Sequence, residues 1–135
     1  MNKQRLIQRL QKEEELVLKP YLCPAGKLTI GYGRNLEANG ISRSEANMLL
    51  ANDIHNSIFQ CEKNILYFKE LSDNVQEVLV DMCFNMGIGG LLGFKNMLTA
   101  IAKGDFEEAK RELLNSNYAK QLPGRSKRNA ELLKT

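Results

Sequence analysis

The stretch that decides the fold is residues 13–33, EEELVLKPYLCPAGKLTIGYG, in which a helix passes into a β hairpin. The helical spacing of apolar residues ends at the acidic run, a turn with proline and glycine follows, and the closing residues alternate as a short strand. This junction carries a carboxylate, a thiol and a hydroxyl with the spacing Glu14-x8-Cys23-x5-Thr29. These residue types are common, so an ordinary junction with solvated glutamates is an equal alternative on spacing alone.

The first helix, predicted over residues 2–15, separates the three glutamates at its end. Glu14 lies four residues after Leu10 and continues the apolar stripe inward, whereas Glu13 lies at the edge of the stripe and Glu15 on the polar face. Three carboxylates at the carboxyl end of a helix repel one another and face the negative end of the macrodipole. We therefore single out Glu14, keep Glu13 in reserve, and expect a basic residue from elsewhere to compensate the charge.

Length and composition indicate a globular protein. The 135 residues fit one domain with its own core, and the hydrophobic share of 43% and charged share of 26% are ordinary. The net charge of +3 fits an acidic partner without choosing between a cell-wall polymer and nucleic acid. The cysteines lack a Cys-x-x-Cys pair and are predicted to be free thiols, and the lone His55 is predicted to be structural or exposed. We expect no metal and no cofactor.

No segment is predicted to cross a membrane or to direct export. The amino terminus lacks an apolar core of secretory-signal length, and no run approaches the ~20 apolar residues of a transmembrane helix. We therefore expect the chain to be made in the cytoplasm, without stable membrane insertion.

The rest of the chain is predicted to be helical. A capping box of Ser42 and Glu45 opens a helix that reaches about residue 65, long enough to join two lobes. Apolar spacing predicts further helices, which run from 72 to 86, from a glycine-rich break to 104, from 105 to 115 and from 125 to 133. The predicted architecture is α+β and mostly helical. It is one domain over residues 1–135, with a β-hairpin lobe at about 1–60 and a helical lobe at about 61–135.

Three ordered segments resemble the phage-type lysozymes (endolysins, glycoside hydrolase family 24). Glu14-x8-Cys23-x5-Thr29, followed by residues 30–33 (IGYG), resembles their catalytic motif, in which Asp or Cys stands at the second position. Residues 84–87 (FNMG), with the Gly-Phe pair and the asparagine that follow at 93–96, resemble their cleft-lining segment. Residues 121–128 (QLPGRSKR) resemble a segment near the carboxyl end of the family. The three matches cover nearly the whole chain.

The resemblance implies a lysozyme-like fold and metal-free hydrolysis of peptidoglycan. The bond cleaved would be the β-1,4 bond between N-acetylmuramic acid and N-acetylglucosamine. Glu14 would be the general acid that protonates the glycosidic oxygen. Cys23 would orient or activate water or stabilise positive charge on the sugar, and Thr29 would help to hold that water.

The resemblance also implies residues that bind substrate and balance charge. Asn35, Phe84 and Asn85 would bind the polysaccharide. Arg125, with Arg128 as the second candidate, would be the basic partner of the acidic helix end. The protein would be a monomer with no nucleic-acid partner, and it would reach the periplasm and cell wall through a holin-made lesion or another release route.

Other functions stay open at this point. Cys23 in place of Asp, and Arg34 where many relatives carry His, leave open a peptidoglycan-binding or structural relative with weakened catalysis. A basic helical module that binds nucleic acid is disfavoured, because recognition helices need lysines and arginines clustered toward one groove. A lytic transglycosylase would use one Glu without a water-activating partner, and its products would distinguish it.

Overall fold

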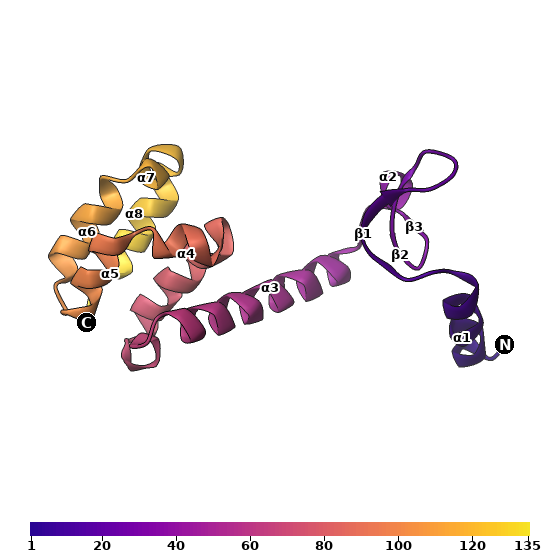
Figure 1. Ribbon diagram of the computed structural model, residues 1–135, viewed down its shortest axis with the longest axis horizontal. Helices are drawn as coiled ribbons and strands as arrows, with labels where there is room; N and C mark the ends of the chain where they lie inside the picture. The colour runs from indigo at the N-terminus through magenta and orange to yellow at the C-terminus, as the bar shows by residue number, and fades with distance from the viewer. The chain divides into compact units, whose positions relative to one another are not determined.

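The computed structural model describes all residues, Met1–Thr135, and divides into two compact units (Figure 1). Unit 1 is Met1–Met48 and unit 2 is Leu49–Thr135; helix α3 (Arg43–Asn64) begins in unit 1 and continues into unit 2. The structure has eight α-helices and one small antiparallel sheet, so the predicted α+β, mostly helical fold class is confirmed. That the two units form a single domain stays a prediction.

Unit 1 is built on a three-stranded antiparallel sheet in the order β1-β2-β3. Its strands are β1 (Val17–Leu22), β2 (Leu28–Gly31) and β3 (Arg34–Asn35). Thr29 lies in the central strand, opposite Tyr21 of β1 and Asn35 of β3. Pro20 lies in β1, which is an edge strand, where a missing backbone N–H costs no ladder hydrogen bond on the open side. The predicted hairpin is therefore present.

The loop between β1 and β2 is a tight turn closed by backbone hydrogen bonds. The N–H of Gly26 donates to the carbonyl of Cys23 at 2.8 Å, and the N–H of Cys23 donates to the carbonyl of Lys27 at 3.0 Å. Gly26 has a φ of 78°, the left-handed conformation with which a three-residue hairpin loop closes. The turn fixes the thiol of Cys23 at the entrance of the loop.

Helix α1 (Lys3–Glu13) ends earlier than the predicted residue 15. Asn2 caps its start by accepting a hydrogen bond from the N–H of Arg5 at 2.9 Å. Glu14 is the C-cap residue, with extended backbone (φ −101°, ψ 130°), and its N–H donates to the carbonyl of Leu10 at 2.8 Å. No residue of α1 is buried, so the structure does not support the inward position that helical spacing predicted for Glu14.

The start of α3 is fixed by the predicted capping box, which is confirmed. The N–H of Glu45 donates to the Ser42 hydroxyl at 3.1 Å, and the N–H of Ser42 donates to the Glu45 carboxylate at 2.8 Å. Arg34 adds an ion pair to Glu45 at 2.6 Å and a hydrogen bond to the carbonyl of Gly40 at 3.2 Å. These contacts join β3 to α3 within unit 1. The four-residue helix α2 (Leu36–Asn39) between them was not predicted.

Unit 2 contains a helical core, which Figure 1 shows as a cluster of short helices around α4. Its elements after α3 are η1 (Phe68–Glu70), α4 (Asp73–Leu92), α5 (Lys95–Ala102), α6 (Phe106–Leu114), α7 (Asn117–Gln121) and α8 (Pro123–Leu132). The predicted stripe of α4 forms the centre, because Val75, Val78, Leu79 and Met82 are fully buried. Each such side chain stabilises the fold by about 1.5–3 kcal/mol through burial.

Two boundaries in unit 2 differ from the prediction. Gly87 interrupts α4 with non-helical backbone (φ 79°, ψ 165°), as predicted for the glycine-rich break, but the helix continues beyond it to Leu92. The last helix was predicted to begin at residue 125, whereas Pro123 begins α8. Proline is tolerated at the first helical position because the N–H it lacks has no partner there. The short helix α7 was not predicted.

Helix α4 is also long and apolar enough to cross a membrane, judged by length and composition alone. In the structure its apolar stripe is packed in the core of unit 2, and Gly87 breaks its regular backbone. The same composition is expected of the central helix of a globular core.

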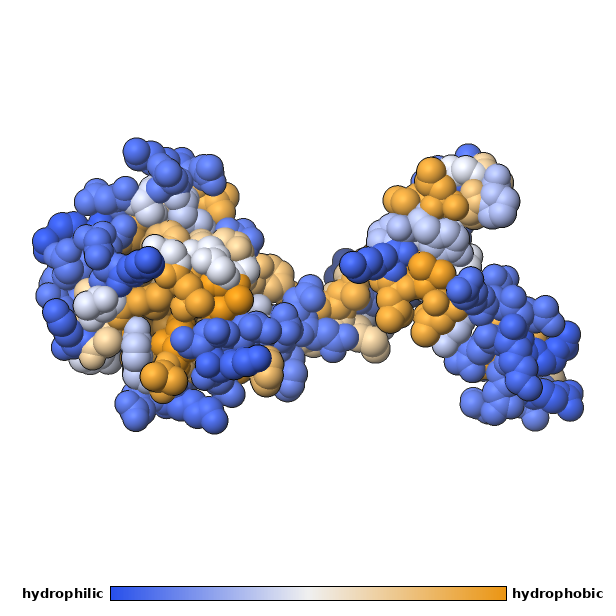
Figure 2. All heavy atoms as spheres, in the orientation of Figure 1, coloured by the Kyte–Doolittle hydropathy of each residue, from blue (hydrophilic) through white to orange (hydrophobic).

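Figure 2 shows further apolar residues gathered on one face of unit 2, whereas α1 is covered largely by hydrophilic residues.

Candidate active site

The carboxylate of Glu14 lies directly against the backbone of Gly33. A methyl group on the Cα of Gly33 would lie 2.9 Å from Oε2 and 3.1 Å from Cδ of Glu14, so the flexible carboxylate would have to shift to make room for it. Gly33 has a φ of 76°, so both its conformation and this contact favour glycine. Glu13, Glu14 and Glu15 are all exposed. The contact with Gly33, rather than helical spacing, is what singles out Glu14.

The thiol of Cys23 lies in a local set of hydrogen-bond donors. Hydrogen bonding to the backbone of Lys27 is the main cause that lowers the pKa of Cys23 below its ordinary value. Partial burial acts in the opposite direction, and the backbone of Ala25 and the hydroxyl of Thr29 lower the pKa further. A lowered pKa increases the thiolate fraction, and the thiolate is the stronger base and nucleophile.

Thr29 is buried, with 4% of its surface exposed, and contacts Cys23 from the central strand. Its hydroxyl donates to the carbonyl of Lys27 at 2.8 Å. A hydroxyl has a single hydrogen, so it donates either to this carbonyl or to the sulfur of Cys23. Donation to the carbonyl suits the neutral thiol, and donation to sulfur suits the thiolate. The structure therefore brings Cys23 and Thr29 together as an interacting pair.

Asn35 has a structural task in unit 1. It is the N-cap of α2, and its Oδ1 accepts a hydrogen bond from the N–H of Ala38 at 3.1 Å. The amide nitrogen of the side chain is left to donate elsewhere. Its predicted contact with polysaccharide stays a prediction.

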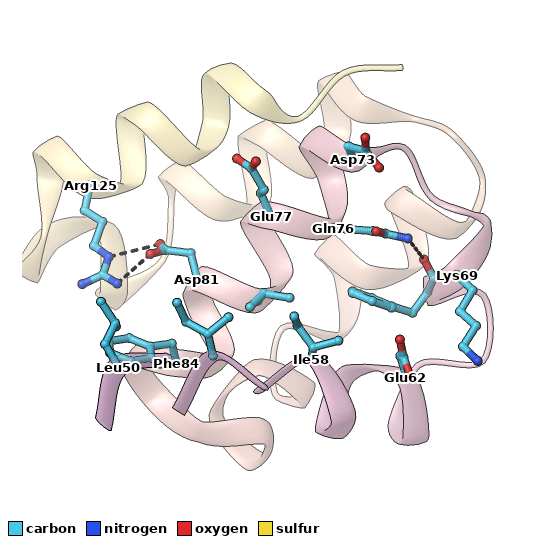
Figure 3. A pocket seen from close by; sticks show the side chains of 13 residues that line it. Leu50, Ile58, Glu62, Lys69, Asp73, Gln76, Glu77, Asp81, Phe84 and Arg125 are labelled. Atoms are coloured by element: carbon cyan, nitrogen blue, oxygen red, sulfur yellow. Dashed lines mark hydrogen bonds and ion pairs between the residues drawn. The ribbon is translucent and has the colours of Figure 1, made fainter. Parts of the chain in front are cut away.

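Unit 2 has a groove of about 800 Å³ lined by apolar side chains with charged groups along it (Figure 3). Figure 3 shows Phe84, Leu50 and Ile58 on one side, and Arg125 with Asp81 at one end. The remaining residues that line the groove are Ile54, Glu62, Phe68, Lys69, Asp73, Gln76, Glu77 and Val80. Phe84 is 42% exposed, so a large aromatic surface is available to a ligand in this groove.

Arg125 is held by a network that sequence analysis missed. Its guanidinium donates to both carboxylate oxygens of Asp81, at 2.6 and 3.1 Å, and Asn129 donates to the same carboxylate at 2.7 Å. Burial raises the pKa of Asp81, but the hydrogen bonds from Arg125 and Asn129 outweigh it and hold that pKa below the ordinary value. Hydrogen bonding to Asp81 raises the pKa of Arg125. The pair is thus charged and bidentate.

Asn85 faces a second groove of unit 2, of about 730 Å³. Adjacent helical residues point about 100° apart, which explains why Phe84 and Asn85 line different grooves. The second groove is rich in amide and hydroxyl groups, from Asn85, Asn96, Asn115, Ser116, Asn117, Tyr118 and Gln121. Such groups can exchange hydrogen bonds with the hydroxyl and acetamido groups of sugars.

The sequence matches the family model described as phage lysozyme over residues 11–131. The chain belongs to the phage lysozyme family. The match includes the Glu14–Thr29 stretch and Arg125. Every predicted site residue therefore lies inside the part of the chain that defines this family.

Two relatives of known description are similar to this phage lysozyme family member. It is 27% identical to the pre-baseplate central spike protein Gp5 of Enterobacteria phage T4, over 93% of this chain and 27% of that protein. It is 31% identical to probable T4-type lysozyme 1 of Dictyostelium discoideum, over 70% of this chain and 58% of that protein. The chain thus spans about a quarter of the first relative and somewhat over half of the second.

Two contacts, between Glu14 and Gly33 and between Asp81 and Arg125, were not predicted from the sequence, for different reasons. The motif IGYG at residues 30–33 contains two glycines, and nothing in the sequence indicates which of them lies beside Glu14. Asp81 could have been noticed, because it is a charged residue next to the buried stripe of α4. Its partner Arg125 is 44 residues away, a separation that local patterns do not reach. That Arg125 also compensates Glu14 stays a prediction.

Proposed function

We propose that this phage lysozyme family member hydrolyses peptidoglycan, at the β-1,4 bond between N-acetylmuramic acid and N-acetylglucosamine. The observation that carries the proposal is the exposed carboxylate of Glu14, which lies beside Gly33 in the same small unit as the Cys23–Thr29 pair. Membership of the phage lysozyme family supports it.

Glu14 is the general acid of the proposed reaction. Its carboxyl group donates a proton to the glycosidic oxygen, so that the leaving sugar departs as a neutral alcohol. Gly33 presents no side chain beside it, which leaves room for a polymer to approach the carboxylate. The role needs an accessible acid, and Glu14 is exposed.

Cys23 and Thr29 act on the water that replaces the leaving sugar. The thiolate of Cys23 accepts a proton from this water, and the hydroxyl of Thr29 holds the water or the sulfur in place. The lowered pKa of Cys23 supports this role, because it increases the fraction of molecules in which Cys23 is a thiolate, and therefore a base, near neutral pH.

Unit 2 supplies the binding surfaces in this proposal. The exposed ring of Phe84 offers a flat apolar face to a sugar ring, and Asn85 lies in the amide-rich groove. The Asp81–Arg125 pair stays charged in the Phe84 groove and offers polar partners to the substrate there.

A turbidity assay on purified peptidoglycan tests the proposal. We expect the wild type to clear the suspension, Cys23→Ser to lose about 10-fold or more because the base is lost, and Cys23→Asp to keep activity because a carboxylate replaces the thiolate. Thr29→Ala should also be slower. Since Thr29 is buried, Thr29→Ser is its matched control and should stay close to the wild type.

The same assay distinguishes hydrolysis from the main alternative, which is binding of peptidoglycan without catalysis. A chain that sediments with peptidoglycan but never clears it is a binding relative without catalysis. Equal activity of the wild type, Cys23→Ser and Cys23→Asp would show that the thiol has no part in the chemistry.

A further inference from the structure

The two buried cysteines of the chain, Cys61 on α3 and Cys83 on α4, interact within the core of unit 2. They are free thiols, with 0% and 4% of their surface exposed. Neither belongs to the candidate active site, whose cysteine is Cys23 in unit 1. They are 22 residues apart in sequence and come from different helices, so the fold itself has placed them together.

The geometry at Leu79 places the sulfur of Cys61, on α3, against the turn of α4 that carries Cys83. The Sγ of Cys61 lies 3.8 Å from the carbonyl oxygen of Leu79. In a regular helix this carbonyl accepts the backbone N–H of the residue four positions later, which is Cys83. Cys61 therefore contacts the turn of α4 that ends at Cys83, close enough for the Cys83 thiol to contribute to the raised pKa of Cys61.

Burial makes Cys61 a poor nucleophile toward a disulfide from solution. Desolvation raises the pKa of Cys61 to about 12, and the neighbouring Cys83 thiol contributes to the shift. The thiolate is the form that exchanges with disulfides. Cys61 is therefore a poor point of first attack, and any oxidation has to begin at its neighbour.

Cys83 has a route to solvent that Cys61 lacks. It lines a cavity of about 450 Å³, together with Ser57, Gln60 and Gly87. The cavity is bordered by the glycine at which α4 departs from helical backbone, so the wall beside Cys83 carries no bulky side chain there. Cys83 therefore borders open space, whereas Cys61 is fully enclosed.

We propose that Cys61 and Cys83 form a disulfide that ties α3 to α4 when a low-molecular-weight disulfide enters this cavity. The Cys83 thiolate attacks the small disulfide, forms a mixed disulfide and releases one small thiol. The Cys61 sulfur then loses its proton, attacks the Cys83 sulfur and releases the second small thiol. Two electrons and two protons pass from the cysteines to the small disulfide, which is reduced to two thiols.

The bond can be reduced again, because a small thiol can enter by the same cavity as the oxidant. Thiols stay reduced in the cytosol and form disulfides in the periplasm and outside the cell. The proposal does not depend on catalysis, although a chain that works at the cell wall would meet the oxidising side.

Peptide mapping after mild oxidation tests whether the Cys61–Cys83 disulfide forms. Trypsin leaves the three cysteines on three different peptides, residues 13–27, 44–63 and 70–95. The full chain is incubated with oxidised glutathione, alkylated in denaturant and digested. We expect a cross-linked pair of peptides 44–63 and 70–95, a Tm higher by several degrees, and, in Cys23→Ser, an intact mass lower by two hydrogen atoms. Cys23, which is only partly buried, should carry glutathione instead.

The variant Cys23→Ser controls for exchange with the third thiol and should form the same cross-link. Cys83→Ala should leave Cys61 open to alkylation in denaturant. Alkylated Cys61 and Cys83 in a sample whose Cys23 has reacted with glutathione would overturn the proposal. So would a cross-link from either buried cysteine to Cys23, or an unchanged Tm in the cross-linked chain.

Discussion

Unit 1 and unit 2 are each stabilised internally by different interactions. In unit 1, Thr29 is the one buried residue, and the unit is held by strand pairing, tight turns, helix caps and the Arg34–Glu45 ion pair. In unit 2, a continuous core built around α4 excludes water from entire side chains. The chemistry proposed for Glu14 and Cys23 lies in the unit with little burial.

This difference predicts a separation of effects. Substitutions at exposed groups of unit 1 should change activity with little change in the free energy of unfolding. Core substitutions in unit 2 should do the opposite, because they remove buried surface and leave cavities. The comparison fails if a change in one unit has the effect expected of the other.

The largest effect is expected from Glu14→Gln. Loss of the acid proton should reduce clearing of peptidoglycan by about 10²–10⁴-fold. The shape of the side chain is kept and the group is exposed, so Tm should stay unchanged. Glu13→Gln is the matched control, one residue away and also exposed, and should remain active. An inactive Glu13→Gln beside an active Glu14→Gln would mean that the wrong carboxylate was chosen.

The same Leu→Ala change placed in each unit tests the other half of the comparison. Leu79→Ala removes a fully buried side chain and should lower the free energy of unfolding by about 2–5 kcal/mol. Leu18→Ala in β1, where the side chain is 78% exposed, should change it by less than about 0.5 kcal/mol. Denaturant titrations with a constant m-value measure both. Similar losses at the two positions would contradict the contrast.

The two glycines of the β2–β3 turn separate strain from chemistry. Gly31 and Gly33 have nearly the same φ, 71° and 76°, so alanine is strained at either. Only at Gly33 does the added methyl group meet the Glu14 carboxylate; at Gly31 nothing lies within 4 Å. We expect similar Tm values for Gly31→Ala and Gly33→Ala but about 10-fold lower kcat for the latter, because its acid is displaced. Equal kcat values would show that the contact does not position Glu14.

The smallest effect is expected from the Arg34–Glu45 pair, and it should disappear at acid pH. The hydrogen bond from Arg34 is the largest of the causes that lower the pKa of Glu45 to about 2. A depressed carboxyl pKa stabilises the folded state above the unfolded value of about 4.3, and this stabilisation is lost as the pH falls toward 2. Glu45→Gln should therefore lower stability slightly at pH 7 and match the wild type near pH 2. A difference that persists at pH 2 would assign the effect to packing.

Local signals in the sequence predicted much of this fold. The capping box at Ser42, the α4 stripe and the hairpin turn each depend on residues close in sequence, and each is present. The end of α1 was placed too late because Glu14 suits the helical spacing, yet its backbone is extended. The last helix was predicted to begin after Pro123, although proline is also common at the first position of a helix.

The candidate site was predictable in its residues but not in its contacts. The spacing of Glu14, Cys23 and Thr29 resembled a known family, and that family is confirmed. The contact of Glu14 with Gly33, the donors around Cys23 and the capture of Arg125 by Asp81 depend on three-dimensional placement. Sequence patterns record which residues are available, whereas these contacts depend on how turns and helices bring them together.

Mass spectrometry of the fragments released from purified peptidoglycan tests the central claim most directly. If Glu14 protonates the glycosidic oxygen and the Cys23–Thr29 pair directs water to the sugar, every cleavage leaves a reducing N-acetylmuramic acid end and a non-reducing N-acetylglucosamine end, and the products together gain one water. Fragments with anhydro-muramyl ends would contradict the account, because they form without attack by water.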